Sequence, residues 1–385
     1  MSKEWREVRL GEIADFINGD RGKNYPSPLD RVENGIPFIN TGHIDSTGWL
    51  SHERMDYISR EKYDKLGSGK VRKGDIVYCL RGSTIGKTAR NRYNEGAIAS
   101  SLIIIRAKEN INQDFLYYFL ISPFGQSLAR INDNGSAQPN LSGKVLSQYP
   151  LKISDFHTQK AIAKILGDLD DKIELNRQMN QTLEEMAQTL FQSWFVDFDP
   201  VMDKALEAGH EIPEALQAKA EKRKAVLARP DRAQLPDEIM AYFPDQFEYN
   251  EALGKWIPMG WEDSTFGNEF NVTMGQSPPG STYNEEEKGV PFFQGKTDFQ
   301  FRFPKNRIYC TSPKRLAQKN DTLISVRAPV GSSNLAKSDC SIGRGLSAVR
   351  HKFDSISYTY YAVLELQKIF DVFEGEGTVF GSINH

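Results

Sequence analysis

The chain has 385 residues, of which 39% are hydrophobic and 26% are charged, a composition typical of a globular protein of two to three domains. No apolar run approaches the roughly 18 residues that a membrane span needs, and the first five residues (MSKEW) hold no apolar signal segment. The three cysteines lie too far apart in the sequence for a close-spaced metal motif, and their sparsity suits a reducing compartment, so we expect a cytoplasmic protein.

The formal net charge of −3 is unevenly distributed along the chain. Residues 1–150 hold 21 Lys and Arg against 17 Asp and Glu, whereas residues 151–260 hold 13 against 20. Residues 261–385 are balanced at 14 against 14. A polyanionic partner would therefore meet the two flanking regions, where local patches matter more than the sum. Charge alone decides neither for nor against nucleic-acid binding.

A pattern in residues 1–153 recurs in residues 259–385, with an offset that falls from 256 to 242. Six collinear matches carry this repeat: Trp5, Leu10 and Gly11 with Trp261, Phe266 and Gly267; residues 35–38 (GIPF) with 289–292 (GVPF); Lys73–Ile76 and Arg81 with Lys319–Thr322 and Arg327; Ile98, Leu102 and Arg106 with Ile342, Leu346 and Arg350; Tyr117-Tyr118 with Tyr360-Tyr361; and Gly135-Ser136 with Gly377-Thr378. Six matches in one order predict two copies of one domain.

Both copies are predicted to be mixed α/β domains, which gives an α+β chain in which a long coiled-coil-type helix separates the repeats. Helices are expected at Phe115–Ile121 and Ser357–Phe370. Strands are expected at Ile36–Asn40, Asp75–Leu80, Ala97–Arg106, Val290–Gln294, Thr322–Val326 and Leu346–Arg350. The framework positions recur, while residues 40–60 and 294–306 share almost nothing. One scaffold with two loop sets indicates two different ligands or sequences.

The segment between the copies is predicted to be one long helix over residues 154–197. Ser154-Asp155 supplies a cap with a carboxylate near the positive end of the helix. Side chains at alternating spacings of four and three form a heptad seam: Ile162, Leu166, Leu169, Ile173, Asn176, Asn180, Leu183, Ala187, Leu190 and Trp194. This pattern favours a coiled coil over a helix packed only on its own domain, so we expect a partner helix to cover the seam. Asn176 and Asn180 would fix its register.

Residues 198–258 are predicted to connect the helix to the second copy, and they contain six prolines from Pro200 to Pro258. One charged helix is expected inside this connector, at about Val201–Ala228. The basic stretch Lys219–Lys224 is interrupted by Glu221, and we expect it to be a solvated face.

An arginine followed by a turn of small residues comes after one predicted strand in each copy, at Arg81–Thr88 and Arg327–Ser333. The first stretch resembles a phosphate-binding P-loop, but Gly82 and Gly86 enclose three residues where that motif needs four, and the second copy has no lysine. Small residues permit close approach to a DNA backbone, and arginine pairs with phosphate or guanine. We therefore favour a DNA contact over a plain turn.

Several loop residues have the chemistry to contact bases or phosphates, because amides pair with adenine and Arg or Lys with guanine. The candidates in the first copy are Lys23, Asn40, Thr41, His43, Arg81, Ser83, Lys87, Arg90, Gln138 and Asn140. Those in the second copy are Gln276, Ser277, Tyr283, Gln294, Lys296, Arg327, Ser332 and Arg344. The histidines are scattered, and Ser277–Gly280 lacks the amide and aromatic of a methyltransferase signature. We expect no catalytic and no metal site in this chain.

The layout and local sequence resemble the specificity subunits of type I restriction–modification systems. The resemblance covers essentially the whole chain, and the helix with its exit is its most specific part. The motifs that carry it are Trp5-x4-Leu10-Gly11, Gln159-x2-Ile162-Ala163-x2-Leu166-x2-Leu169-Asp170-x2-Ile173, Phe191-x2-Trp194–Pro200 (WFVDFDP), and Gly275–Gly280 (GQSPPG).

The resemblance implies a DNA-binding subunit without catalytic activity, in which each target-recognition domain reads one half of a bipartite site. Modification subunits and a restriction subunit would be the partners and would bring S-adenosylmethionine, ATP and Mg²⁺. The second copy stops at Gly381–His385, so the second long helix of the family is missing from the sequence. We therefore expect the seam to self-associate or to be covered by a partner subunit.

Two other functions remain open at this stage. A coiled-coil assembly protein could use the repeated domains to bind protein, which a gel shift with duplex DNA would decide. An NTPase could use the Gly82–Thr88 loop, which a nucleotide-binding assay would decide.

Overall fold

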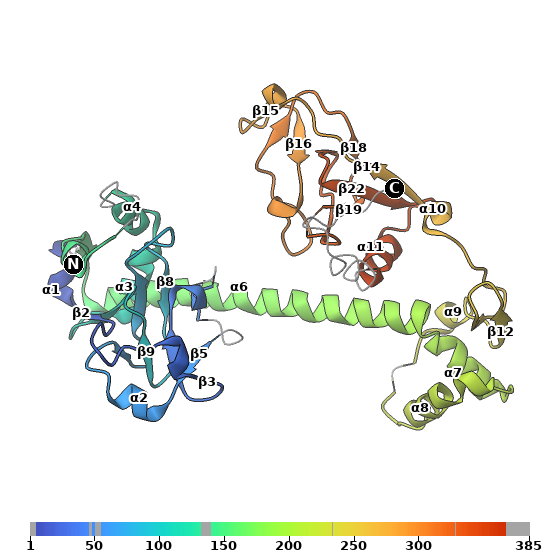
Figure 1. The fold of residues 1–385 in the computed structure, drawn as a ribbon, viewed down its shortest axis with the longest axis horizontal. Helices are drawn as coiled ribbons and strands as arrows, with labels where there is room; N and C mark the ends of the chain where they lie inside the picture. Colours follow the sequence, from blue (N-terminus) through green and yellow to red (C-terminus); the bar gives the residue numbers. More distant parts are fainter. Residues whose placement is uncertain are drawn as a thin grey trace. The chain divides into compact units, whose positions relative to one another are not determined.

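The computed structural model describes residues 5–45, 48–50, 55–131, 140–232, 234–327 and 329–366 (Figure 1). The chain divides into two compact units, Met1–Met179 and Asn180–His385, and each holds one copy of the repeat. Helix α6 (Phe156–Phe191) begins in the first unit and ends in the second. Two mixed α/β domains separated by a long helix are the architecture that the sequence predicts, so the predicted α+β class is confirmed.

The central sheet of the first domain is buried on both faces. Its strand order is β2-β10-β7-β8, with the bounds Ala14–Asn18, Leu102–Ala107, Ile76–Cys79 and Thr88–Arg90. Successive side chains of β10 point to opposite faces, so Ile103 and Ile105 join one core and Ile104 joins the other. Burial on both faces explains why β10 is an apolar run without polar alternation.

Helices close the core on one face of this sheet. Leu116 and Leu120 come from α3 (Gln113–Ile121), and Leu146 comes from α5 (Gly143–Ser147). Asn112 caps α3 by accepting a hydrogen bond from the Phe115 N–H at 2.9 Å. The remaining elements on this side are α1 (Leu10–Ile13), α4 (Pro123–Ile131), and the paired strands β1 (Arg6–Arg9) and β11 (Pro150–Ile153).

A second sheet of the first domain has the order β3-β5-β4-β9-β6. Its strands are Arg31–Val32, Asp56–Ile58, Ile36–Ile39, Gly96–Ile98 and Lys70–Val71, and α2 (Arg60–Asp64) follows β5. The single strand that we predicted over Ala97–Arg106 is wrong. The chain leaves β9 after Ile98 and enters β10 at Leu102, whose N–H donates to the Ala99 carbonyl at 3.0 Å. Both strands are apolar, so hydrophobicity does not mark the turn between the two sheets.

The second domain repeats this topology strand for strand, which confirms the repeat. Its sheets have the orders β14-β22-β19-β20 and β15-β17-β16-β21-β18. The strands of the first are Phe270–Met274, Leu346–His351, Thr322–Ser325 and Ser333–Leu335, and those of the second are Tyr283–Asn284, Tyr309–Cys310, Val290–Phe293, Cys340–Ile342 and Leu316–Ala317. Helices α10 (Phe266–Glu269) and α11 (Ile356–Glu365) take the places of α1 and α3. Residues 367–370 of the predicted helix lie outside the described residues.

The long helix α6 runs for 36 residues without interruption, a length of about 54 Å. Asp155 caps it, since its carboxylate accepts from the Thr158 N–H at 3.0 Å and from the Thr158 hydroxyl at 2.7 Å. The helix ends in one π-helical turn, η3 (Gln192–Val196). Phe198, whose φ of 55° is left-handed, separates this turn from the next helix.

The heptad seam of α6 is covered at its ends and open in its middle. Ile162 and Leu166 pack half-buried against the core of the first domain, and Trp194 packs on Phe243 in the second unit. The middle of the seam is exposed among the described residues: Leu169, Ile173, Asn176, Asn180, Leu183 and Leu190. The expectation that a partner helix must cover the whole seam is therefore wrong for its ends, because the chain's own domains bury them.

The connector folds into short elements around a small core of Met202, Ala205, Ile212 and Ala220. Its elements are α7 (Asp199–Ala208), η4 (Glu214–Leu216), α8 (Gln217–Leu227), α9 (Asp237–Met240) and the hairpin β12 (Phe247–Asn250) with β13 (Lys255–Pro258). The single helix predicted over Val201–Ala228 is wrong, since left-handed Gly209 ends α7.

The predicted solvated face of α8 is wrong for Lys219 and Arg223, whereas Lys222 and Lys224 are exposed as expected. Arg223 forms a bidentate contact with Asp203 at 2.8 and 2.5 Å, and Lys219 lies 3.7 Å from Asp199. These pairs join α8 to α7.

Among the helices that the structure describes, none combines the length and apolar character required to cross a lipid bilayer.

Candidate nucleic-acid interface

The ends of strands β2 and β7 in the first domain surround an open cavity of about 620 Å³. Arg21, Arg81 and Asn140 line it, and Arg81 and Asn140 form an isolated antiparallel bridge. Gly19 lets the loops come together, because a Cβ there would lie 2.5 Å from the Ala99 carbonyl oxygen. We call the side chains around this cavity, with the turn that follows Arg81, the first strand-end surface.

Arg21 belongs to this surface although the sequence analysis did not select it. Its guanidinium lies 3.4 Å from the Ser100 carbonyl, and the preceding Asp20 holds the loop by accepting from the N–H groups of Gly22 and Gly67 at 2.6 and 2.8 Å. These backbone hydrogen bonds, led by the one from Gly22, lower the pKa of Asp20. The repeat could have predicted Arg21, because the strand registers align it with Ser277, which is among the candidates from the sequence.

The loop Gly82–Thr88 is a turn between antiparallel strands β7 and β8. Gly82 and Gly86 have φ values of 77° and 84°, and the Lys87 N–H donates to the Thr84 carbonyl at 3.0 Å. A phosphate-binding P-loop opens a helix, whereas this loop opens a strand. Arg81, Ser83 and Lys87 are exposed, and the Lys87 ammonium donates to the Ile44 carbonyl at 3.2 Å.

The predicted residues Asn40, Thr41 and His43 lie together in the short turn η2 (Thr41–His43). Asn40 accepts from the Gly42 N–H at 2.8 Å and donates its amide to Asp56 at 3.1 Å. His43 is buried, and its Nδ1 accepts from the Asn40 N–H at 3.1 Å. The histidine therefore builds the turn, while Thr41 is half-buried at its start.

Three other candidates of the first copy do not line the cavity or lie outside the described residues. Lys23 is exposed, and Gln138 lies in the part of the chain that the structure does not describe. Arg90 has a side chain that is only 14% exposed and lies between Asp114 and Asp170. It points toward α6 rather than toward the strand ends.

The second domain brings its candidates together at the equivalent strand ends. The Ser277 hydroxyl donates to the Gln294 side chain at 2.9 Å and accepts from the Arg344 N–H at 3.3 Å. Gly343 and Gly345 permit this approach, since a Cβ on either would lie 2.6 or 2.5 Å from an oxygen of Gln294. Gln294 and Arg344 are exposed, so a ligand can reach them.

The remaining candidates of the second copy surround this group. The Lys296 ammonium donates to the Ser332 hydroxyl at 3.3 Å. Arg327 and Gln276 are exposed, and the Gln276 N–H donates to the Ile342 carbonyl at 3.0 Å. Tyr283 stacks on Phe292 and donates its hydroxyl to the Pro278 carbonyl at 2.8 Å. We call Gln276, Ser277, Gln294, Lys296, Arg327, Ser332 and Arg344 the second strand-end surface.

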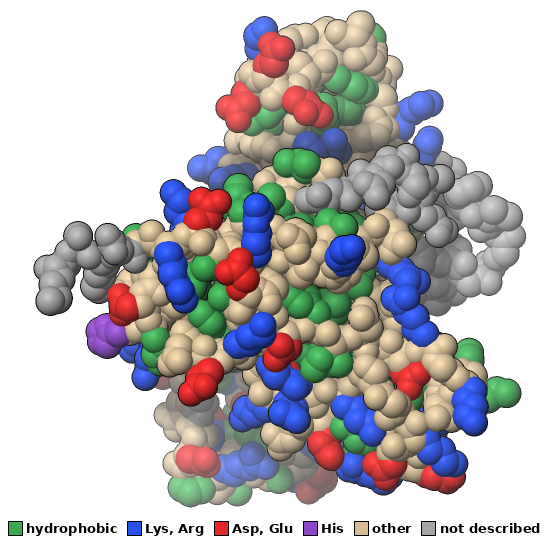
Figure 2. Space-filling model, turned by 90° about the vertical axis from the view of Figure 1, so that its left-hand side faces the viewer, with side chains coloured by type: hydrophobic (Ala, Val, Ile, Leu, Met, Phe, Trp, Pro, Cys, Tyr) green, Lys and Arg blue, Asp and Glu red, His purple; other side chains and the backbone are tan. Residues whose placement is uncertain are grey.

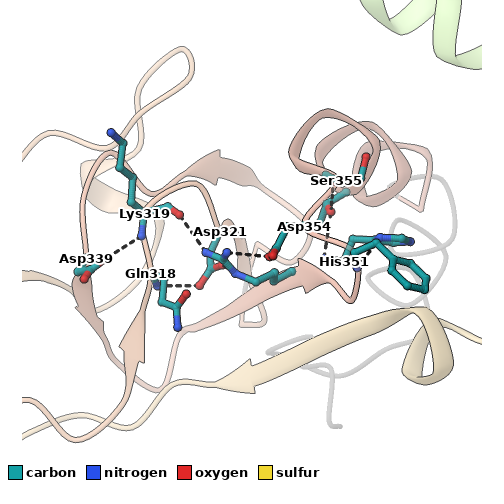
Figure 3. Close-up of polar contacts among 10 residues, drawn as sticks. Gln318, Lys319, Asp321, Asp339, His351, Asp354 and Ser355 are labelled. Carbon is teal, nitrogen blue, oxygen red and sulfur yellow. Dashed lines mark hydrogen bonds and ion pairs between the residues drawn. The ribbon is translucent and has the colours of Figure 1, made fainter.

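One ion pair holds the same corner of the framework in both domains, and Figure 3 shows the contacts around Asp321 in the second domain. Arg106 binds Asp75 through two hydrogen bonds of 2.8 and 2.7 Å, and Arg350 binds Asp321 at 2.6 Å. Figure 3 shows Asp321 between Gln318 and Asp354; it accepts from the Gln318 N–H at 2.7 Å. Burial raises the pKa of Asp321 and outweighs the opposite effects of this hydrogen bond and of Arg350. These residues are parts of the scaffold.

The two strand-end surfaces differ in chemistry. The first presents the cations Arg21 and Lys87 where the strand registers give the second Ser277 and Ser332. The second also presents two exposed amides, Gln276 and Gln294. Figure 2 shows the side of the molecule at the left of Figure 1, where Lys and Arg side chains are interspersed with Asp and Glu. On this face, binding of a polyanion would therefore rest on local groups of cations rather than on one continuous basic surface.

No group of three or more His, Cys, Asp or Glu side chains among the described residues is arranged to hold a metal ion. The cysteines Cys79, Cys310 and Cys340 are buried and unpaired, and burial raises the pKa of the Cys340 thiol to about 12. The polar side chains of both strand-end surfaces can instead donate hydrogen bonds to a ligand or accept them from it.

Residues 2–185 match the family model described as "Type I restriction modification DNA specificity domain". The chain is 28% identical to the putative type I restriction enzyme MjaX specificity subunit of Methanocaldococcus jannaschii, over 99% of this chain and 80% of that protein. It is 32% identical to the type I restriction enzyme HindI specificity subunit of Haemophilus influenzae, over 76% of this chain and 65% of that protein. The chain belongs to the type I specificity subunits.

The fold agrees with this assignment. The crystal structure of the type I restriction–modification S subunit from M. genitalium is 16% identical and has a TM-score of 0.51, with 99% of this chain and 84% of that chain covered. The chain spans 65% of the length of the H. influenzae specificity subunit.

Proposed function

We propose that this specificity subunit binds double-stranded DNA and that each domain reads one half of a bipartite target through its strand-end surface. The observation that carries the proposal is the contrast within the repeat. The same Asp–Arg pair supports both domains, whereas at the strand ends Arg21 and Lys87 of the first domain are replaced by Ser277 and Ser332 in the second.

The two surfaces suit different base edges. Arginine can bind guanine O6 and N7 through two hydrogen bonds, and glutamine can bind adenine N6 and N7 in the same way. Lys87 and Lys296 are held near the surface by single hydrogen bonds of 3.2 and 3.3 Å, which suits cations that neutralise phosphate. Sequence would then be read by the exposed arginines and glutamines, and register would be set by the lysines.

The partners that we propose are the modification subunits and the restriction subunit of a type I complex. Their S-adenosylmethionine, ATP and Mg²⁺ would supply the chemistry, and this chain would contribute target choice without a catalytic group of its own, in the cytoplasm. The exposed middle of the α6 seam, with Leu169, Ile173 and Leu183 about half exposed, supports docking of a helix from a partner subunit or a second copy.

The other two functions have less support. The Gly82–Thr88 loop joins two strands and offers no helix N-terminus to a nucleotide phosphate. An assembly protein that binds only protein is not favoured, because the relatives of this chain are specificity subunits.

Selection from a random duplex library tests the proposal. We expect the chain, mixed with its modification subunit, to enrich two short defined sequences separated by a fixed number of unspecified base pairs. Binding should weaken steeply between 50 and 200 mM salt, because each neutralised phosphate releases counterions. Enrichment of no sequence, or binding that does not respond to salt, would contradict the proposal.

A further inference from the structure

In each unit, one arginine and two neighbouring tyrosines of the recognition domain form a cluster with one acidic residue of α6. The first clasp, as we call it, consists of Arg90, Tyr117, Tyr118 and Asp170. The second clasp consists of Arg302, Tyr360, Tyr361 and Glu184. We propose that these eight side chains are positioning residues that fix the orientation of each recognition domain on the long helix.

The first clasp is closely packed. The Tyr118 hydroxyl donates to Asp170 at 2.7 Å, and the Arg90 guanidinium lies 3.4 Å from the same carboxylate oxygen. The guanidinium carbon lies 4.5 Å from the centre of the Tyr117 ring and 4.2 Å from that of Trp49. A cation between aromatic rings and a carboxylate has little freedom to reorient.

The second clasp repeats this chemistry on a later turn of α6. Arg302 pairs with Glu184 and also donates to the Tyr361 hydroxyl at 3.3 Å. Its guanidinium carbon lies 4.5 Å from the centre of the Tyr360 ring. The Glu184 carboxylate, with a side chain that is 11% exposed, also accepts from the Tyr361 hydroxyl at 3.5 Å.

The arginines of the two clasps come from different places in the repeat: Arg90 ends β8, whereas Arg302 lies in the segment between β16 and β17. The register of β7 with β8 and of β19 with β20 aligns Arg90 with Leu335, not with Arg302. Arg302 instead aligns with Gly48, because the Arg90 N–H donates to the Gly48 carbonyl and the Leu335 N–H donates to the Arg302 carbonyl. Both copies thus place a guanidinium against the tyrosine pair, although not at an equivalent position. An arginine retained from a common ancestral domain would occupy the same position in both copies. Because the two arginines occupy different positions, the contact itself is indicated to be required.

The consequence is a fixed relation between helix and strand ends in each unit. Tyr117 and Tyr118 belong to α3 and Tyr360 and Tyr361 to α11, and each of these helices packs on the central sheet of its domain. Holding the tyrosine pair on α6 therefore holds the sheet whose ends carry the strand-end surface. The value of this orientation for DNA rests on the proposed function, but the contact and its test do not involve DNA.

The test measures the docking of the second domain on α6 in the full chain without DNA. Nitroxide labels are placed at two exposed positions, Gln188→Cys on the helix and Lys314→Cys on the domain. The native cysteines are buried and should not react. Glu184→Gln should lower the ratio of the docked population to the undocked population, read from the distance distribution, at least about tenfold. This factor corresponds to about 1.4 kcal/mol for a lost charge-assisted hydrogen bond.

Three controls decide between a clasp and general damage. Glu185→Gln removes the neighbouring exposed carboxylate and should leave the distances unchanged, as should Asp170→Asn, which breaks only the first clasp. Arg302→Glu should undock the domain, and combining it with Glu184→Arg should restore docking. Unchanged distances in Glu184→Gln, an equal effect of Glu185→Gln, or no recovery in the reversed pair would overturn the proposal.

Discussion

The two recognition domains have the same framework and different ligand-facing chemistry. Asp75 and Arg106 in the first occupy the places of Asp321 and Arg350 in the second, and both tyrosine pairs contact α6. At the strand ends, by contrast, Arg21 stands where the second domain has Ser277. Conserved chemistry within the repeat therefore marks the scaffold, and changed chemistry at a shared location marks the surface that selects a ligand.

The largest expected effect comes from exchanging one whole surface. Replacing residues 261–385 with the second domain of another specificity subunit should change one half of the DNA target and leave the other half intact. Affinity for the original half should fall roughly a thousandfold, toward non-specific binding. Selection from a random duplex library measures this. If both halves change together, the domains do not read separately.

The exposed stretch of α6 belongs to neither domain surface, and its disruption should affect assembly alone. Leu169→Asp with Leu183→Asp should weaken association with the helix partner more than about a hundredfold, because two buried leucines contribute about 3–6 kcal/mol. Sedimentation of the chain with and without its modification subunit measures the change. Gln188→Asp, another exposed position of the helix, is the matched control. A chain that stays monomeric and binds its partner equally well in all forms would refute a role for the seam.

The cations of the two surfaces should contribute separately to the salt dependence of DNA binding. Lys87→Gln and Lys296→Gln should each reduce the slope of log affinity against log salt by about 1, since each removes one phosphate contact. Fluorescence anisotropy at several salt concentrations gives the slopes. Lys222→Gln, an exposed cation of the connector, should change nothing. Equal slopes in all three variants would place the DNA elsewhere.

The smallest effect concerns the framework ion pairs. Burial raises the pKa of Asp321, so the folded chain binds its proton more tightly than the unfolded chain does. The stabilising effect of this proton is present below the ordinary pKa of 3.8 and is lost as the pH rises through the raised value. The free energy of unfolding of the wild type, relative to Asp321→Asn, should therefore decrease as the pH rises above about 4. Denaturant titrations at several pH values measure it, and a constant difference would contradict this origin of the shift.

Much of the fold could be predicted because its signals are local or repeated. The heptad spacing from Ile162 to Trp194 predicts α6, and the six matched positions predict two equivalent domains. The turn between β9 and β10 escaped prediction because Ala99–Ser101 offers no Gly or Pro between two apolar strands. The break after α7 was not predicted, because the charged pattern continues past Gly209 and Pro213, whose residue types end helices.

The candidate site was harder to predict, because the type of a residue does not show which way its side chain points. The structure brings the candidates Ser277, Gln294 and Arg344 of the second copy together, because each follows the end of a strand. In the first domain, His43 is buried in its turn and Arg90 faces α6, although both have suitable chemistry. Arg21 was missed because its loop was not compared with residues 275–277 of the other copy.

The most direct test of separate reading combines point variants with target selection. The chain is assembled with its modification subunit as the wild type, as Arg21→Ala with Arg81→Ala, and as Gln276→Ala with Gln294→Ala. Each assembly then selects from the same random duplex library. We predict that the first variant relaxes the sequence of one half-site only and the second relaxes the other half only, with the spacing unchanged. Relaxation of both halves by either variant, or full retention of the motif in both, would contradict reading by the strand-end surfaces.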